Sequence, residues 1–239
     1  MTILVVDRWM EYRGTVIHRV DTGGRQAYAY LSPRVAITAD GAPDAYHPEN
    51  IGSGHLRHTQ WPDGDWQHAL VADPRHPRRP LQQTAGRHAG YFVSITALND
   101  PSRSRTDPGA YVDAGRIPYL VLPEPFHALD GSGDLGDFVI AYHPGTRRSS
   151  YGVIGDIGGD RALGEISTRM ASDLSGLRAE PRSGRGVPPG PTLCLVFPQS
   201  RLTPAWPMPP AAIRARCEQL LKNLGGQERL AQLAEALEE

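Results

Sequence analysis

The chain has 239 residues, which is long enough for one domain with a sizeable hydrophobic core. Apolar residues make up 39% of the chain and charged residues 21%, a balance that argues against a disordered or fibrous protein. The formal net charge of -1 gives no electrostatic basis for binding a phosphate backbone, so we expect no nucleic-acid partner.

The amino terminus, residues 1–7, does not resemble a secretory leader. It has no basic region, its apolar run is short, and no small-residue cleavage site follows it. No stretch of the chain approaches the roughly 18 apolar residues that a membrane span requires. We therefore expect no membrane association and a cytoplasmic location as synthesised, with export by a route that bypasses the Sec machinery as the alternative.

The 26 glycines and 22 prolines favour turns between short strands over a helical bundle. Short apolar or alternating runs predict strands at residues 15–19, 27–31, 34–38, 69–72, 91–98, 117–122, 137–142, 150–157 and 192–197. Because no helix is predicted after each strand, this order argues against a parallel α/β sheet and for an antiparallel or barrel-like β core. The basic run at 75–79 is interrupted by a proline, and we expect a solvated loop there.

The two cysteines point to packing and not to a metal centre. Cys194 lies in the apolar run 193–197 and is predicted to be a core residue, and its spacing from Cys217 suits neither a disulfide framework nor a zinc site. We expect no metal and no cofactor.

Helical periodicity appears late in the chain. A short helix is predicted at 167–177, and two amphipathic helices separated by Gly225 and Gly226 are predicted within 209–239. Their apolar stripes consist of Ile213, Cys217, Leu220, Leu221 and Leu224, and of Leu230, Leu233, Ala234 and Leu237. Such a helical hairpin either packs on the β domain or docks a partner or carrier protein.

The candidate chemistry lies in residues 150–167. A predicted strand ends at Asp156, Gly158 and Gly159 predict a turn, and Glu165 follows on the far side of that turn. Hydrolysis of a glycoside requires one protonated carboxyl group at the leaving oxygen and one ionised carboxylate on the other side of the sugar. A strand end and the far side of a glycine turn can place two carboxyl groups in this way, although such acidic loops also occur on surfaces without a catalytic role.

Ordered sequence blocks extend this pattern over most of residues 28 to 200. They include ADGAP at 39–43, AYHP at 45–48, YVD at 111–113, YGVIGDIG at 151–158 and GEIS at 164–167, with further blocks at 66–72, 90–94, 117–123, 133–135 and 195–200. In this order and spacing the chain resembles the fungal-type chitosanases of glycoside hydrolase family 75. The resemblance implies that Asp156 and Glu165 are the essential carboxylates and that hydrolysis inverts the anomeric carbon.

An inverting mechanism implies about 6.5–9.5 Å between the two carboxyl groups, so that a water molecule fits beneath the sugar. We expect Glu165 to be the general acid and Asp156 the general base. Burial raises a carboxyl pKa and suits the acid, but the sequence does not show which of the two is buried.

Further polar residues are candidates for a sugar-binding cleft: Asp40, Asp44, Tyr46, His47 and Asp113. Carboxylates in the cleft would hold the ammonium groups of chitosan. The same aspartates flank glycine or proline and are equally typical of turns. His47 is expected to form a structural or substrate contact, because no second ligand sits at metal-binding spacing. Trp61 and Trp66 are candidates for stacking on sugars, with core packing as the alternative.

Two features depart from the family pattern. Thr38 occupies a position where fungal members usually carry an acidic residue, and those members are secreted with a signal peptide. The family implies a polysaccharide substrate. Chitosan follows from the resemblance, and peptidoglycan, cleaved by an antibacterial effector or lysin that an immunity protein would bind, follows from the departures. A non-catalytic glycan-binding domain is the hypothesis of another class. The fold we expect is mainly β, with a β-barrel-type catalytic domain over 1–208, a double-psi barrel by analogy, and a C-terminal α-helical hairpin over 209–239.

Overall fold

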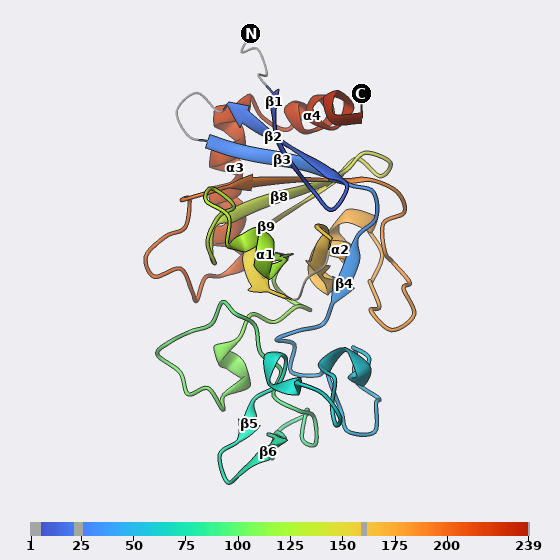
Figure 1. Ribbon diagram of the computed structural model, residues 1–239, viewed down its shortest axis with the longest axis vertical. Coiled ribbons are helices and arrows are strands. Elements are labelled where there is room, and N and C mark those ends of the chain that lie inside the picture. The colour runs from blue at the N-terminus through green and yellow to red at the C-terminus, as the bar shows by residue number, and fades with distance from the viewer. Residues whose placement is uncertain (1–5, 22–25, 159–161, 239) are drawn as a thin grey trace.

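The computed structural model describes residues 6–21, 26–158 and 162–238, and it is mainly β, as predicted (Figure 1). The strands are β1 (Val6–Tyr12), β2 (Thr15–Asp21), β3 (Gln26–Ser32), β4 (Ala36–Thr38), β5 (Ala72–Asp73), β6 (His76–Pro80), β7 (Tyr119–Leu122), β8 (Phe138–His143), β9 (Arg148–Ile157), β10 (Glu165–Ser167) and β11 (Thr192–Phe197). The α-helices are α1 (Glu124–His127), α2 (Thr168–Ser175), α3 (Pro210–Leu224) and α4 (Glu228–Glu238), and 3-10 turns cover Leu56–Thr59, Trp66–His68 and Pro108–Ala110.

Nine strands form one curled half-barrel sheet in the order β1-β2-β3-β11-β8-β9-β7-β10-β4. Neighbouring strands are antiparallel except for β7 with β9 and β10 with β4. Within the described residues β1 and β4 are the two edge strands and do not pair with each other, so the sheet is open. The double-psi barrel suggested by analogy is not shown.

Alternating side chains of the central strands fill two cores, one on each face of the sheet. On β7, Tyr119 and Val121 belong to the core that α3 covers, whereas Leu120 and Leu122 belong to the core that α1 and α2 cover. This period of two is the geometry of an extended strand whose two faces are both buried. Cys194 is buried on the α2 side, which confirms its predicted place in the core.

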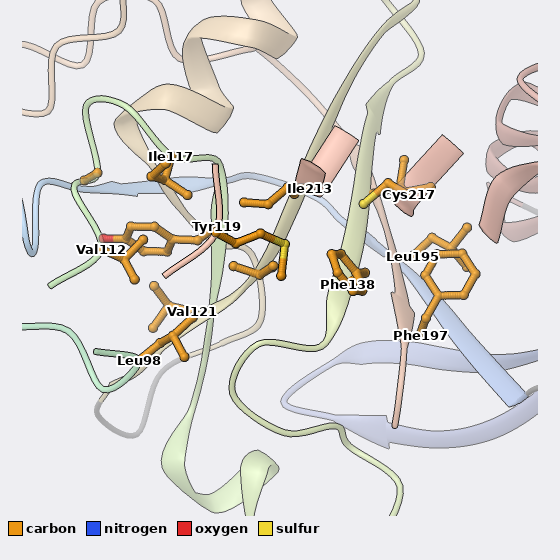
Figure 2. Close-up of a cluster of buried hydrophobic side chains, with 14 of the residues drawn as sticks. Leu98, Val112, Ile117, Tyr119, Val121, Phe138, Leu195, Phe197, Ile213 and Cys217 are labelled. Atoms are coloured by element: carbon orange, nitrogen blue, oxygen red, sulfur yellow. The ribbon is translucent and has the colours of Figure 1, made fainter. Parts of the chain in front are cut away.

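The C-terminal helices form and pack on the sheet, as the helical pattern predicted. Ile213 and Cys217 of α3 are fully buried among side chains of β7, β8 and β11 (Figure 2). The stripe of α4 is also buried in this core, at Leu230, Leu233 and Ala234. The apolar stripes are therefore largely covered by the protein itself, with Leu237 partly buried, which is the packing expected of a hairpin on the β domain.

Residues between β4 and β7 depart most from the predicted elements. The run 91–98 is not a strand and makes only isolated bridges, Gln82 with Phe92 and Leu70 with Ser94. The run 69–72 is not a continuous strand either, because only Ala72 belongs to a strand, the two-residue β5. The basic run 75–79 is not a loop, because most of it lies in β6, an exposed strand paired with β5. This region forms the irregular lower half of the molecule (Figure 1). Side chains satisfy its backbone there, since Ser94 Oγ accepts from Gly41 N at 3.1 Å and Thr96 Oγ1 accepts from Val112 N at 2.9 Å.

Two strands of the sheet escaped the sequence patterns: β1 at one edge, and β10 between β7 and β4. The apolar residues of β1 do not alternate regularly with polar ones, and β10 has only three residues, so neither gives a clear strand pattern. The predicted helix at 167–177 is α2, whose first turn is capped by Ser167 Oγ accepting from Met170 N at 3.2 Å. The turn predicted at Gly158 and Gly159 lies partly outside the described residues.

Candidate active site

Asp156 and Glu165 lie on the two strands that flank β7. Val121 of β7 pairs with Asp156 of β9 on one side and with Glu165 of β10 on the other. Residues in register across neighbouring strands project to the same face of a sheet. Two strand spacings place their Cα atoms about 10 Å apart. The sheet therefore presents two carboxyl groups on one face with one strand between them.

A β-bulge sets the direction of Asp156. Leu120 pairs with Ile154 and Val121 pairs with Asp156, so Gly155 is an extra residue on β9. Without it, alternation would turn Asp156 to the opposite face of the sheet. A Cβ atom at Gly155 would lie 2.6 Å from both Cβ and Cγ of Tyr119, a separation that packed atoms do not reach. Glycine at this position therefore allows the backbone of β9 to pack directly against the side chain of Tyr119, with Asp156 projecting into the site.

Asp40 joins the two carboxylates from the turn after β4. Tyr46 donates its hydroxyl to Asp40 Oδ1 at 2.7 Å, and Thr38 donates its hydroxyl to Asp40 Oδ2 at 2.8 Å. Tyr119 donates its hydroxyl to the backbone oxygen of Asp40 at 2.9 Å. Asp40 therefore belongs to the centre of the site, and Tyr46 belongs there through it. Thr38, which departs from the family pattern, is a hydrogen-bond donor to that centre.

The phenols of Tyr46 and Tyr119 report the same clustering. Burial is the main cause that raises both phenol pKa values well above the usual range, and the charges of Asp40, Asp156 and Glu165 add to the shift in both cases. Because all three charges act on both phenols, we infer that Asp40, Asp156 and Glu165 lie close to Tyr46 and Tyr119.

Burial raises the pKa of Asp156 well above that of an ordinary aspartate, and the charge of Asp40 raises it further. Two backbone donors oppose this shift, Ala97 N at 2.7 Å and Ile157 N at 2.9 Å, and both bond to Oδ1. Burial also raises the pKa of Asp40, against the hydrogen bonds from Tyr46 and Thr38. The pair therefore keeps a proton at a pH where exposed carboxyl groups are ionised, with Oδ2 of Asp156 available to carry it.

A cavity of about 480 Å³ opens beside Asp156. Its lining includes Asp156, His68, Asn99, Arg103, Arg105 and Tyr111. The segment 99–111 forms one wall, closed by a bridge between Asn99 and Tyr111. A volume of this size is typical of sites that enclose part of a small ligand or one unit of a polymer.

Three of the candidates for sugar binding lie apart from this centre. Asp113 lines a second, largely apolar cavity of about 510 Å³, together with Trp206 and Met208. Burial raises the pKa of Asp113 and the charge of Asp44 raises it further, so these two aspartates are neighbours. The ring of His47 packs on Tyr91 with centroids 4.9 Å apart, and its Nδ1 accepts from Glu49 N at 3.2 Å.

The sequence analysis did not identify some residues of the site. The charges of His68 and His58 act on Asp40, and both histidines lie on 3-10 turns of the lower half. Such turns have no helical or strand periodicity, so their side chains cannot be placed from sequence alone. Trp61 and Trp66 pack edge to face with centroids 5.5 Å apart, and Trp66 is buried, which favours the core-packing alternative for that residue.

No family model matches the chain, and no curated protein matches it. The likeness to the chitosanases therefore stays a hypothesis based on the sequence blocks. In the part of the chain that the structure describes, no three or more histidine, cysteine, aspartate or glutamate side chains are grouped so as to hold a metal ion. Nor does any helix there have the length and apolar character needed to cross a membrane.

Proposed function

We propose that the protein is a glycoside hydrolase that cleaves β-1,4 bonds of an amino-sugar polymer with Asp156 and Glu165 as its catalytic pair. The observation that carries this proposal is the register of β7: Val121 lies between the two residues, and both project to the same face. With Cα atoms about 10 Å apart, side chains inclined toward each other bring the carboxyl groups into the range of an inverting enzyme.

Asp156 is the better candidate for the general acid, which reverses the roles expected from the sequence. Burial and the charge of Asp40 raise its pKa, so its carboxyl group retains a proton to donate to the glycosidic oxygen. Its Oδ1 is held by two backbone donors, which leaves Oδ2 to carry the proton. Glu165 is then the general base.

The reaction follows from these roles. Glu165 takes a proton from a water molecule, and the water oxygen attacks the anomeric carbon from the face opposite the leaving group. The bond from the anomeric carbon to the glycosidic oxygen breaks, and that oxygen takes the proton of Asp156. A β-linked strand yields a new reducing end in the α configuration. Glu165 then loses its proton to solvent and Asp156 takes one from solvent, which restores both carboxyl groups to their starting states.

Release of reducing ends from chitosan, N-acetylated chitin oligomers and peptidoglycan strands tests the proposal. We expect Asp156→Asn and Glu165→Gln each to lower the rate by about 10²- to 10⁴-fold while the melting temperature shows a folded protein. Asp63→Asn, which removes an exposed carboxylate from a turn of the lower half, is the matched control and should keep the wild-type rate.

Two results would contradict the proposal. Near-wild-type turnover by either variant would remove that residue from the catalytic pair. Binding of the oligomers without release of reducing ends by the wild-type protein would instead favour a non-catalytic glycan-binding domain. The configuration of the first product, followed by NMR before mutarotation, separates inversion from retention.

A further inference from the structure

One wall of the cavity beside Asp156 carries two arginines. Arg103 and Arg105 both line this cavity, on the segment that the bridge between Asn99 and Tyr111 closes. Tyr111 donates its hydroxyl to the backbone oxygen of Arg105 at 2.9 Å, and Asp107 caps the 3-10 turn that follows by accepting from Gly109 N at 2.8 Å. The wall is therefore a structured segment that holds the two arginines beside the candidate acid.

The two guanidinium groups differ in their partners. Arg103 is paired with Asp107 at 2.8 Å and with Asp100 at 3.4 Å, so two carboxylates already balance its charge. Arg105 is exposed, and among the described residues no carboxylate lies within ion-pair distance of its guanidinium group. Arg105 is thus the cation that a bound molecule can meet.

The balance of charge along the cavity follows from these pairs. Asp100 is paired with Arg103, and its Oδ1 also accepts from the backbone and the hydroxyl of Ser102 at 2.9 and 2.7 Å. Asp107 does not line the cavity, so among the carboxylates and guanidinium groups that do, Asp100 offsets Arg103. With Asp156 in its protonated, acid form, the charge of Arg105 is then left without an offsetting carboxylate in the lining that the structure describes. An ammonium group at this position is repelled, whereas a carboxylate is attracted and fits the planar guanidinium group in a bidentate pair.

We propose that Arg105 is an anion-recognition residue of a subsite beside Asp156, and that the polymer cleaved carries carboxylates on its amino sugars. This inference rests on the proposed glycoside hydrolysis. Strands with the lactyl ether of muramic acid have this chemistry, through the free lactyl carboxylate or through the carboxylates of a peptide attached to it. Polycationic chitosan does not have it.

Binding to the Asp156→Asn protein tests the subsite without turnover. The probes are peptide-free oligosaccharides of alternating N-acetylglucosamine and N-acetylmuramic acid, the same oligosaccharides with the carboxylates converted to methylamides, and peptide-bearing fragments of the same length. We expect the acidic peptide-free probe to bind about tenfold more tightly than the methylamide probe, because one charge-assisted pair is lost in the latter. The peptide-bearing probe shows whether peptide carboxylates serve equally well.

Arg105→Ala in the same background should remove most of that preference, and Arg78→Ala should keep it. Arg78 is an exposed arginine on β6, so its removal changes the net charge of the protein by the same amount. The preference should also shrink when salt is raised, since the pair is partly exposed. Equal affinity for the acidic and methylamide probes, or a preference that survives in Arg105→Ala, would overturn the subsite.

Failure of this inference and failure of the proposed function have different signatures. Asp156-dependent cleavage of neutral chitin oligomers with no preference for acidic strands would leave hydrolysis standing and refute the role of Arg105. An Arg105-dependent preference in binding, without cleavage of any strand by the wild-type protein, would support the subsite and refute hydrolysis.

Discussion

Gly155→Ala tests whether the bulge in β9 delivers Asp156 to the site. The added Cβ atom would lie 2.6 Å from Cβ and Cγ of Tyr119, and that side chain is fully buried, so β9 or the ring must move by about 1 Å to restore a normal contact. Overpacking of this kind typically costs about 1–3 kcal/mol. For a chain of this size, each kcal/mol lowers the melting temperature by about 2–4 °C.

The same displacement reaches the site from two sides. Asp156 follows Gly155 directly, and the hydroxyl of Tyr119 donates to the backbone oxygen of Asp40 at 2.9 Å. A misplacement of about 1 Å can lower the rate of an enzyme by about 10²-fold. We therefore expect kcat of Gly155→Ala to fall far more than its modest loss of stability would suggest. Thermal unfolding and the rate of reducing-end release on the same samples measure the two effects.

Gly158→Ala is the matched control, because it lies on the other side of Asp156, and among the described residues its added Cβ atom would meet only Cγ1 of Val121, at an ordinary 3.4 Å. We expect its melting temperature to stay within about 1–2 °C of wild type, in line with a substitution that makes no clash. The reasoning about the bulge is wrong if the two variants behave alike, or if Gly155→Ala keeps full activity.

Three further predictions follow from the buried groups. The raised pKa of Asp156 means that the folded state binds its proton more tightly than the unfolded state, so this group's contribution to stability is complete below about pH 4 and is lost as pH rises through the folded-state pKa. Asp156→Asn should therefore melt close to wild type at pH 4 and above it at neutral pH, and an equal difference at both pH values, measured by calorimetry, would contradict this. Tyr46→Phe removes the 2.7 Å hydrogen bond that lowers the pKa of Asp40, so the limb of the pH–rate profile that reports the Asp40–Asp156 pair should move to higher pH, and an unchanged profile would separate Asp40 from the chemistry. Ile213→Ala removes a fully buried side chain of α3 and should cost about 2–5 kcal/mol in denaturant unfolding, whereas the exposed Lys222→Ala should stay within about 0.5 kcal/mol, and similar values for both would mean that α3 is not part of the core.

Apolar runs were sufficient to predict the central strands. The predicted strands at 137–142, 150–157 and 192–197 match β8, β9 and β11 closely. In β8 and β11 side chains are buried on both faces, which gives a nearly continuous apolar run in the sequence. The C-terminal helices could also be predicted, from the helical spacing of their apolar residues. The run 91–98 had the same local pattern and is not a strand, since its backbone groups find partners in side chains and isolated bridges.

The candidate site was predictable only in part. Asp156 and Glu165 were proposed from a motif. Their common neighbour Val121 belongs to a strand more than thirty residues earlier in the chain, so the motif could not show that this strand lies between them. Asp40 and Asp44 carried the same turn signal, and only the fold showed that Asp40 faces Asp156 whereas Asp44 lies near Asp113.

The β class and the C-terminal helices could be predicted from the amino-acid sequence, because the periodicity of apolar residues is a local property of a strand or a helix. The two acidic residues came from a local motif and from the order of the sequence blocks. Three features are visible only in the folded chain: the bulge at Gly155, the proximity of three carboxylates to Tyr46 and Tyr119, and the place of Arg105 in the cavity lining. These features depend on which strands pair and in which register, and the free energy that selects a register comes from contacts between segments far apart in the chain.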